Sequence, residues 1–411
     1  MTREPPPHLA DSTPSAALPS GRWNPAQPIM AGTLAAVVGY ASTFTLVLAA
    51  LTAAGATPAQ AGSGLMALCL GLGVLNMAVS ARTRTPISFA WSTPGAAFLL
   101  TVGEPAGGFQ AVVGAFLVTA LLVVLTGLFR PLARLIAAIP ASLANAMLAG
   151  MLLSLCLAPV EAVAQVPAMA LPILLTWALG LRFARRYAVP IAVVVTGLVL
   201  AITTHLPPGA LEGTWPSLSF VAPAVSLDAI VRISVPLYIV TMASQNLPGL
   251  AVLRANGVTV NPAGPFVLTG IASGVTALFG SITTNLAAIT AAICAGPEAH
   301  PDPSRRWPAP VAAGATYVVL GLGASLAAAF VAASPPILIQ AVAGLALLSS
   351  LATALAAALA DEGQRLPAIL TFVATASGIT VIGIGAPFWG LVGGIALLLL
   401  LRQPKTAPHA G

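Results

Sequence analysis

The chain has 411 residues, of which 58% are hydrophobic and only 6% are charged, and its mean hydropathy is +0.97. Because soluble domains carry about 25% charged residues, this composition excludes a soluble protein and predicts an all-α polytopic membrane protein. The formal net charge of +6 comes from basic residues scattered between apolar runs, which indicates membrane topology rather than nucleic-acid binding. The three cysteines show neither metal-binding nor disulfide spacing.

Short polar tails are expected at residues 1–27 and 402–411, both in the cytoplasm. The first is rich in Pro, Ala and Ser, lacks the apolar core of a cleavable signal peptide and is expected to be disordered. A helix needs about 20 residues to cross the hydrocarbon layer of a membrane. Charged, Pro-rich and Gly-rich breaks divide the rest of the chain into fourteen apolar segments, expected at residues 28–53, 60–80, 86–103, 108–129, 132–157, 167–181, 187–206, 227–248, 264–279, 283–296, 309–331, 335–359, 365–383 and 385–401.

The basic residues support this division, because cytoplasmic connections are enriched in Lys and Arg. With the amino terminus inside, only Arg232 of the sixteen Lys and Arg residues falls on the outer side. The acidic residues expected on that side are Glu104, Glu161, Glu212 and Asp228. The pattern therefore predicts an even number of segments with both ends of the chain in the cytoplasm.

A long connection rich in Pro and Gly, at residues 207–226, is expected on the outer side and separates two halves of seven segments, 28–206 and 227–401. Because seven is odd, the second half starts on the opposite side of the membrane, as in the inverted repeats of many secondary transporters. The third segment of each half is interrupted by polar residues that precede a short run of helix formers. Paired interruptions at matching positions are the best sequence indication of a substrate site.

Each interrupted segment is expected to contain a short β-like break and a half-helix that begins in the middle of the membrane. The first N–H groups of such a helix lack intrahelical partners and, with the helix dipole, carry partial positive charge. Two such ends facing each other suit a small carboxylate without any Lys or Arg. The residues predicted to bind substrate there are Ser92, Thr93, Pro94 and Gly95 in the first half and Thr283, Thr284 and Asn285 in the second. The alternative is that these side chains only cap helices.

Other polar residues lie inside apolar segments. Gln245 and Asn246 precede a Pro-Gly pair that is expected to break the eighth segment, and amides are costly in a membrane. We predict that both bind substrate, with hydrogen bonding between helices as the alternative. Ser42, Thr43 and Trp91 are further candidates, although hydroxyl groups often bond their own helix and aromatic rings often only pack. Catalytic, metal-binding and cofactor-binding motifs are absent from the sequence, so an enzyme is not supported.

Three motifs give the sequence a resemblance to a known family. They are Phe89-Ala-Trp-Ser-Thr-Pro-Gly-Ala-Ala97, Ser244-Gln-Asn-Leu-Pro-Gly-Leu-Ala-Val-Leu-Arg-Ala-Asn-Gly257, and the run from Asn285 to Trp307. They resemble the bacterial benzoate/proton symporters, the BenE-type transporters, and the resemblance covers nearly the whole membrane region. More distantly, the chain is similar to nucleobase and anion transporters built from seven-plus-seven inverted repeats.

The resemblance implies an importer of benzoate or a similar aromatic carboxylate in the bacterial inner membrane, with a proton as the coupling ion. It also implies a core domain of segments 1–4 and 8–11 and a gate domain of segments 5–7 and 12–14, which forms a homodimer. Nucleobase relatives place carboxylates near the positions of Gln245 and Asn285, and neutral amides suit an anionic substrate better. The same change leaves no acid in mid-membrane to carry the proton. A same-fold transporter of another organic anion or a nucleobase, and an anion-selective channel, stay open as alternatives.

Overall fold

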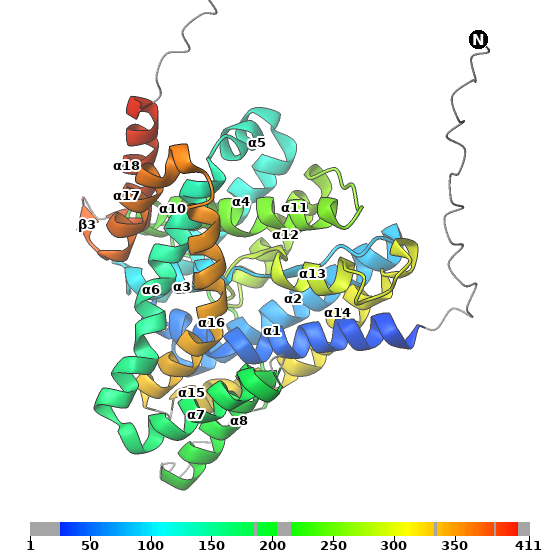
Figure 1. Cartoon of the computed structure of the whole chain (residues 1–411), viewed down its shortest axis with the longest axis vertical. Coiled ribbons are helices and arrows are strands. Elements are labelled where there is room, and N and C mark those ends of the chain that lie inside the picture. The colour runs from blue at the N-terminus through cyan, green and yellow to red at the C-terminus, as the bar shows by residue number, and fades with distance from the viewer. Residues whose placement is uncertain (1–24, 185–186, 204–214, 333–334, 382–383, 402–411) are drawn as a thin grey trace, which may run out of the picture.

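The first half of the chain is helical apart from one short strand (Figure 1). The computed structural model describes residues 25–184, 187–203, 215–332, 335–381 and 384–401. The elements of this half are α1 (Ala26–Ala53), α2 (Pro58–Thr83), β1 (Phe89–Trp91), α3 (Thr93–Val102), α4 (Gly108–Leu128), α5 (Arg130–Ala137), α6 (Ala141–Gln165), α7 (Pro167–Phe183) and α8 (Ala188–Thr203). The expected tails, apart from residues 25–27, and residues 207–214 of the expected connection at 207–226 lie outside the described residues.

The second half again places a short strand and a short helix after its first long helices. Its elements are α9 (Leu227–Ala229), η2 (Ile230–Ser234), α10 (Val235–Thr241), η3 (Met242–Asn246), α11 (Leu247–Ala255), α12 (Ala263–Ala277), β2 (Thr284–Leu286), α13 (Ile289–Ala295), η4 (Pro303–Arg305), α14 (Pro308–Leu322), α15 (Ala324–Ala332), α16 (Pro336–Ala358), η5 (Glu362–Gln364), α17 (Arg365–Ala376), β3 (Thr380–Val381), β4 (Ile384–Gly385) and α18 (Ala386–Leu401). Each expected segment contains at least one of these helices.

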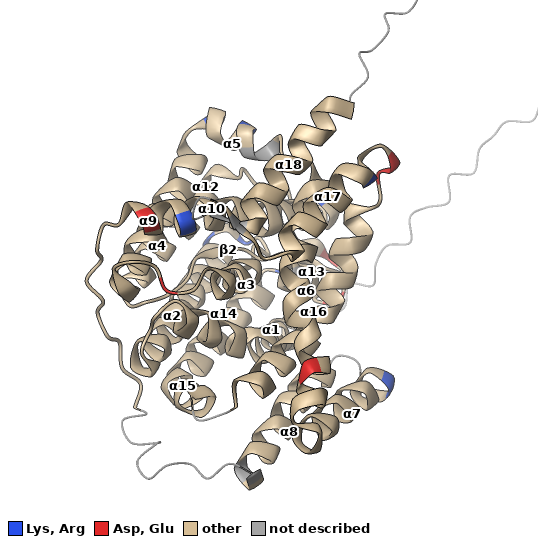
Figure 2. Cartoon of the chain, turned by 90° about the vertical axis from the view of Figure 1, so that its left-hand side faces the viewer, with Lys and Arg blue, Asp and Glu red and all other residues tan. Residues whose placement is uncertain are grey.

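Length and composition identify the membrane-spanning helices. Six helices of the described chain are long and apolar enough to cross a membrane, and a seventh span results if α14 and α15, bent by 53°, are counted together. Shorter apolar helices, α3 among them, accompany these spans. Charged positions lie at helix ends and in connections, and most of the ribbon between them carries no charge (Figure 2). The chain is therefore an all-α membrane protein with several apolar spans.

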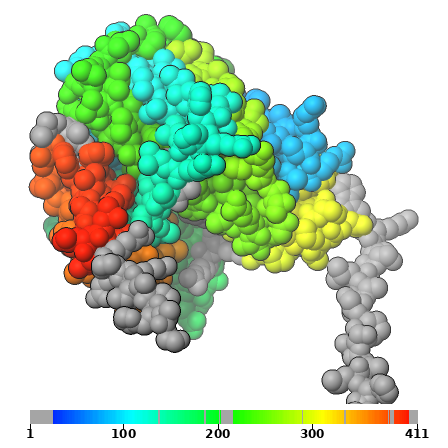
Figure 3. Space-filling model, turned by 90° about the horizontal axis from the view of Figure 1, so that it is seen from above, coloured from blue at the N-terminus to red at the C-terminus, as the bar shows by residue number. Residues whose placement is uncertain are grey.

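Helices from the two halves pack against each other rather than forming separate bundles. α2 packs against α14, α4 against α12, and α6 against α16 and α17. At the contact of α2 with α14, a Cβ atom on Gly314 would lie only 2.7 Å from the carbonyl oxygen of Gly73. Small residues of this kind let two backbones approach closely in a membrane. Figure 3 shows the result from above, with cyan segments of the first half next to green and yellow segments of the second.

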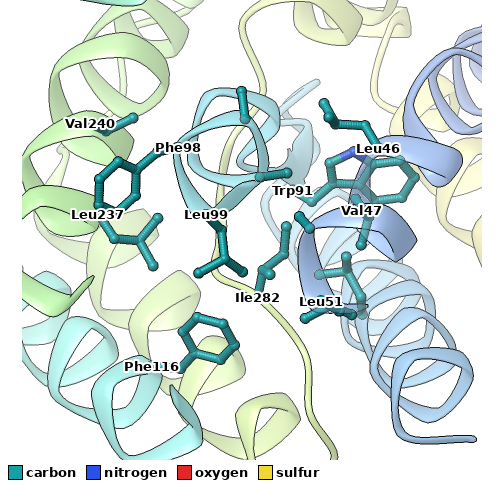
Figure 4. Packing of buried hydrophobic residues seen from close by; sticks show 14 of the residues in the cluster. Leu46, Val47, Leu51, Trp91, Phe98, Leu99, Phe116, Leu237, Val240 and Ile282 are labelled. Atoms are coloured by element: carbon teal, nitrogen blue, oxygen red, sulfur yellow. The ribbon is translucent and has the colours of Figure 1, made fainter. Parts of the chain in front are cut away.

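The short helix α3 is embedded in this packing rather than exposed to lipid. Phe98 and Leu99 are fully buried, and Figure 4 shows Phe98 beside Leu237 and Leu99 above Phe116. On the other side, Trp91 of β1 lies next to Leu46 of α1. Because apolar side chains from three helices surround it, α3 holds a fixed position inside the protein.

Three segments differ from the sequence expectation. The segment expected at 132–157 is divided, because Pro140 has an extended backbone that separates the short helix α5 from α6. The eighth segment does not break at Pro248, since the helix continues to Ala255 and a π-helical turn, η3, precedes the proline instead. The segment expected at 365–383 ends its helix at Ala376 and continues into the β3–β4 hairpin.

Candidate functional site

The two interrupted segments meet at a two-stranded antiparallel sheet. β1 pairs with β2 in the register Phe89 with Leu286, Ala90 with Asn285 and Trp91 with Thr284. The backbone N–H of Ser92 extends the ladder by donating to the carbonyl oxygen of Thr283 over 3.1 Å. Because α3 follows β1 and α13 follows β2, antiparallel pairing brings the beginnings of two distant helices to one place.

The outer edges of this sheet are satisfied by side chains, as a strand inside a membrane requires. Asn76 of α2 accepts a hydrogen bond from the N–H of Phe89 (2.9 Å) and donates one to the carbonyl oxygen of Phe89 (3.0 Å). On the opposite edge, Ser273 of α12 accepts from the N–H of Thr284 (2.9 Å). The sheet is thus held by the helix that precedes each strand.

A cavity of about 430 Å³ lies beside the sheet. One part of its lining comes from α1, the end of β1, the start of α3, η3, α11, α14 and the residues around the start of α13, and the other part comes from α6 and α16. Its volume falls within the range of roughly 300–1,000 Å³ that is typical of small-molecule sites. The cavity is therefore large enough to hold a small organic molecule.

Trp91 and Tyr317 form an aromatic wall of the cavity. Their ring centroids are 5.6 Å apart, and Tyr40 lies edge-on to Trp91 with centroids 6.1 Å apart. The indole N–H of Trp91 donates to the hydroxyl of Thr43 over 2.9 Å, which fixes the orientation of the ring. The side chains of Trp91 and Tyr317 are almost fully buried, so they offer the cavity a small aromatic surface that is already held in position, which reduces the entropy cost of binding an aromatic ligand.

Gln245 lines the cavity with its polar end available. It belongs to the π-helical turn η3, and single π turns inside α-helices occur frequently at functional sites. Among the described residues, its amide has no hydrogen-bond partner, whereas the neighbouring Asn246 is engaged with the sheet: its oxygen accepts from the N–H of Leu286 over 2.9 Å. Gln245 can therefore hydrogen-bond a ligand.

The lining carries polar but no charged side chains among the residues that the structure describes. Ser244 and Thr290 each have a buried hydroxyl oxygen without a hydrogen-bond partner in the described chain. The remaining hydroxyl and amide groups come from both walls: Ser42, Thr43, Thr93, Asn145, Gln245, Tyr317, Ser349, Ser350 and Thr353. A neutral cavity with unused hydrogen-bonding groups can bind an anion without the repulsion that a carboxylate would cause.

The two helices that begin at the cavity differ in length and in capping. α3 has ten residues, and its first turn, with Thr93 and Pro94, lines the cavity. Its N-terminus is partly capped, since the hydroxyl of Ser92 accepts from the N–H of Gly95 over 3.1 Å. α13 has only seven residues and no capping side chain. Both helix starts therefore place backbone N–H groups near the cavity, and α3 is the longer helix of the two.

The residues predicted from the sequence fall into two groups. Those that line the cavity are Ser42, Thr43, Trp91, Thr93, Pro94 and Gln245. Those that lie buried behind it are Ser92, Gly95, Asn246, Thr283, Thr284 and Asn285. Thr241 connects two residues of the second group that come from different halves of the chain. Its hydroxyl donates to the hydroxyl of Ser92 (3.0 Å) and lies 3.3 Å from the hydroxyl of Thr283. A direct role in substrate binding stays a prediction for all twelve residues.

Several lining residues were not predicted from the sequence. Ser244 directly precedes the predicted Gln245, and Thr290 of α13 follows the predicted Asn285 of β2 by five positions. Ser349 and Thr353 of α16 are four positions apart on one helix face, where the hydroxyl of Thr353 donates to the carbonyl oxygen of Ser349. Polar residues with this spacing in an apolar segment are a signal that could have identified α16.

The loop at residues 296–307 closes the far end of α13. Arg306 is buried and donates to the carbonyl oxygens of Ala295 (2.7 Å), His300 (2.6 Å) and Pro301 (3.0 Å). Hydrogen bonds from the hydroxyl and backbone N–H of Ser304 lower the pKa of the half-exposed Asp302. In the described chain no group of three His, Cys, Asp or Glu side chains is placed to hold a metal ion. The loop is thus a structural cap of the half-helix.

Comparison of the sequence with known proteins identifies clear relatives. The profile of the family described as "Benzoate membrane transport protein" (BenE) matches residues 23–400. The "Inner membrane protein YdcO" of Escherichia coli (strain K12) is 40% identical over 383 residues, which cover 92% of this chain and 96% of that protein. The "Benzoate membrane transport protein" of Acinetobacter baylyi (strain ATCC 33305 / BD413 / ADP1) is 32% identical over 380 residues, which cover 92% and 96%.

Solved structures show the same fold at low sequence identity. The transmembrane domain of a cyanobacterium bicarbonate transporter, BicA, gives a TM-score of 0.61 with 16% identity and covers 90% of this chain and 97% of its own. The structure of SLC26A9 gives a TM-score of 0.60 with 11% identity and covers 92% and 66%. The chain therefore shares the fold of these membrane domains.

Proposed function

Because the chain belongs to the benzoate membrane transport protein family, a family of transporters and not of enzymes, we propose that it is a secondary active transporter importing benzoate or a similar aromatic carboxylate. The relative from Acinetobacter baylyi that carries the name of a benzoate transporter supports the substrate. The relative from Escherichia coli, named as an inner membrane protein, supports the bacterial inner membrane as the location. Both termini lie in the cytoplasm, as the distribution of Lys and Arg indicates.

The observation that carries this proposal is the composition of the large cavity. Its lining combines an aromatic wall, at Trp91 and Tyr317, with neutral hydrogen-bonding groups and no charged side chain in the described chain. The carboxylate of the substrate binds at the first turn of α3 and the amide of Gln245, and the ring packs against Trp91. Aromatic packing contributes about 0.5–1.5 kcal/mol beyond burial of the ring, and hydrogen bonds to a charged group contribute about 1.5–3 kcal/mol each.

The fold supports a mechanism of alternating access. We propose that the fourteen segments form two inverted repeats, with segments 1–4 and 8–11 as the core domain and segments 5–7 and 12–14 as the gate domain. The cavity has one wall from α1, α3, η3 and α13, which belong to the proposed core domain, and the other from α6 and α16, which belong to the gate domain. Movement of one domain against the other exposes the site to either side of the membrane. The gate domain also forms the proposed homodimer contact.

The coupling ion in this proposal is a proton, as the resemblance to benzoate/proton symporters implies. Uptake of labelled benzoate into proteoliposomes, with and without an imposed pH gradient, tests both parts. We expect saturable uptake that rises when the outside is acidic and that a protonophore abolishes. Absence of saturable uptake would exclude benzoate, and uptake indifferent to the gradient would exclude the proton alone. Saturable uptake of a labelled nucleobase or another organic anion, without saturable uptake of benzoate, would favour the same-fold alternative.

Accumulation separates a transporter from an anion-selective channel. A symporter concentrates the substrate inside the vesicle beyond its outside concentration, whereas a channel only equilibrates it along the electrochemical gradient. We expect accumulation driven by the pH gradient at zero membrane potential. Equilibration without accumulation under those conditions would favour the channel.

A further inference from the structure

We infer that Arg232 and Thr375 form a second carboxylate-binding site at the outer end of α3, where the substrate binds before it reaches the large cavity. This inference rests on the proposed function and names an entry site for it. A cavity of about 100 Å³ lies there, lined by residues of α3, η2, α6, α17 and α18. Because typical sites for whole ligands begin at roughly 300 Å³, this cavity fits the carboxylate group and not the entire molecule.

Arg232 reaches this cavity with one donor unused. One terminal nitrogen of its guanidinium donates to the carbonyl oxygen of Val102, at the end of α3, over 3.2 Å. The other lies 3.4 Å from a carboxylate oxygen of Asp228. The third nitrogen, Nε, is buried and has no hydrogen-bond partner in the described chain. A buried donor without a partner costs free energy, and an anion in the adjacent cavity would satisfy it.

Thr375 of α17 supplies a second group of the same kind. It also lines the small cavity, is only 4% exposed, and its hydroxyl oxygen has no hydrogen-bond partner in the described chain. Ser154 of α6 and Thr101 of α3 add two further hydroxyl groups to the lining. A carboxylate accepts several hydrogen bonds at once, so a guanidinium N–H and nearby hydroxyl groups match its chemistry.

The charge at this position favours an anion despite the neighbouring Asp228. That ion pair is long and partly exposed, and exposed pairs contribute only about 0–1 kcal/mol, so Asp228 neutralises Arg232 incompletely. Arg232 is also the only basic residue expected on the outer side of the membrane. An anion approaching from outside therefore meets one localised positive charge, which raises its local concentration and its association rate.

The position of the small cavity links it to the large one. α3 separates the two, with its first turn at the large cavity and its last carbonyl groups at Arg232. The small cavity lies between α3 and η2 of the proposed core domain and α6, α17 and α18 of the proposed gate domain. Separation of these domains on the outer side would open a path along α3 from one site to the other.

Sided transport measurements test this site. We expect Arg232→Gln to raise the KM for external benzoate about tenfold, the loss of one hydrogen bond to a charged group, with little change in the maximal rate or in the KM for efflux from the inner side. Thr375→Val should raise the external KM less. The external KM of the wild type should rise with ionic strength, and that of Arg232→Gln should not.

Arg365→Gln is the matched control. Arg365 also pairs with an acid, Glu362, over 3.0 Å and donates to a helix-terminal carbonyl oxygen, that of Leu359, but on the expected inner side. The external KM of Arg365→Gln for benzoate should equal that of the wild type. A wild-type external KM in both Arg232→Gln and Thr375→Val would overturn the inference. A lower maximal rate at unchanged KM would also overturn it, because that result indicates that these residues hold the two domains together and do not bind substrate. Absence of benzoate uptake by the wild type would instead overturn the proposed function, and the inference with it.

Discussion

Asn76 forms two hydrogen bonds with the backbone of Phe89, one as acceptor and one as donor, and so replaces the missing neighbour of β1. An unpaired strand edge inside a membrane leaves N–H and C=O groups without partners, because lipid offers none. A single amide side chain is matched to this task, since it carries a donor and an acceptor side by side. The sheet that positions the first turn of α3 therefore depends on α2.

Replacement of Asn76 should destabilise the protein. In Asn76→Leu the N–H and C=O of Phe89 lose their partners, and each unsatisfied buried group costs about 1–3 kcal/mol. We expect a clear fall in the thermal unfolding temperature of the purified protein in detergent, together with loss of uptake. Thr83→Ala, which removes an exposed hydroxyl at the end of the same helix, is the control and should leave the temperature unchanged. Equal stability of Asn76→Leu and the wild type would show that the edge does not need this residue.

A negative charge at Gln245 should weaken substrate binding. Gln245→Glu places a carboxylate in the cavity, and like charge raises the KM for benzoate by about tenfold or more. Gln245→Ala should raise it less, because it removes a hydrogen bond without adding repulsion. The effect of Gln245→Glu should decrease as the pH falls, since protonation of the introduced Glu removes the repulsion. As a control, Gln60→Glu adds the same charge outside the cavity and should leave the KM for benzoate unchanged. A wild-type KM in Gln245→Glu would exclude Gln245 from the site.

The aromatic wall predicts a graded response to substitution. Trp91→Ala should raise the KM for benzoate about tenfold through loss of ring packing, and Trp91→Phe should largely preserve it. Thr43→Val leaves the indole N–H of Trp91 without its acceptor, so an intermediate effect is expected. Trp389→Ala, on α18 away from the cavity, should behave as the wild type in uptake. Similar KM values in Trp91→Ala and Trp91→Phe would mean that the ring does not contact the substrate.

Arg306 should act through stability and not through substrate affinity. Arg306→Gln removes hydrogen bonds to four carbonyl oxygens, including that of Ala295 at the end of α13. We expect a lower unfolding temperature with an unchanged KM in the protein that remains folded. Arg306→Lys should not restore stability, because one ammonium group cannot reach the same set of acceptors as a guanidinium. Arg305→Gln is the adjacent control, since Arg305 is half-exposed and its side chain forms an ion pair with Asp302 in the described chain. A changed KM in Arg306→Gln would assign the loop a role in binding.

Much of the architecture could be predicted from the sequence because the membrane imposes strong rules. Long apolar segments, the distribution of Arg residues and two paired interruptions indicated a polytopic protein with half-helices, and the family resemblance indicated a transporter. Two local expectations failed for reasons of backbone geometry. Pro248 does not end its helix, because the π-helical turn η3 accommodates the hydrogen bond that a proline cannot donate. Pro140 does divide an expected helix, because its backbone is extended.

Only the tertiary structure decided which polar residues face the cavity. Thr284 and Asn285 were predicted from the same cluster as the substrate site, yet the structure buries both in the sheet, where the hydroxyl of Thr284 lies 3.0 Å from that of Ser273. Conversely, Ser349 and Thr353 line the cavity from α16, far along the chain. Hydropathy reveals that a polar group is costly in a membrane, but not which neighbour satisfies it.

The sequence by itself thus determined the type of protein, the two places where polar residues interrupt an apolar segment before a short helix, and the residues from which a site could be built. The fold then divided those residues between the sheet and the cavity wall. The physical reason is that every polar group in a membrane must find a partner, and the partner can come from any helix that packs nearby. For Asn246 the partner is the backbone of Leu286, while Gln245, one position earlier, is left available for a ligand.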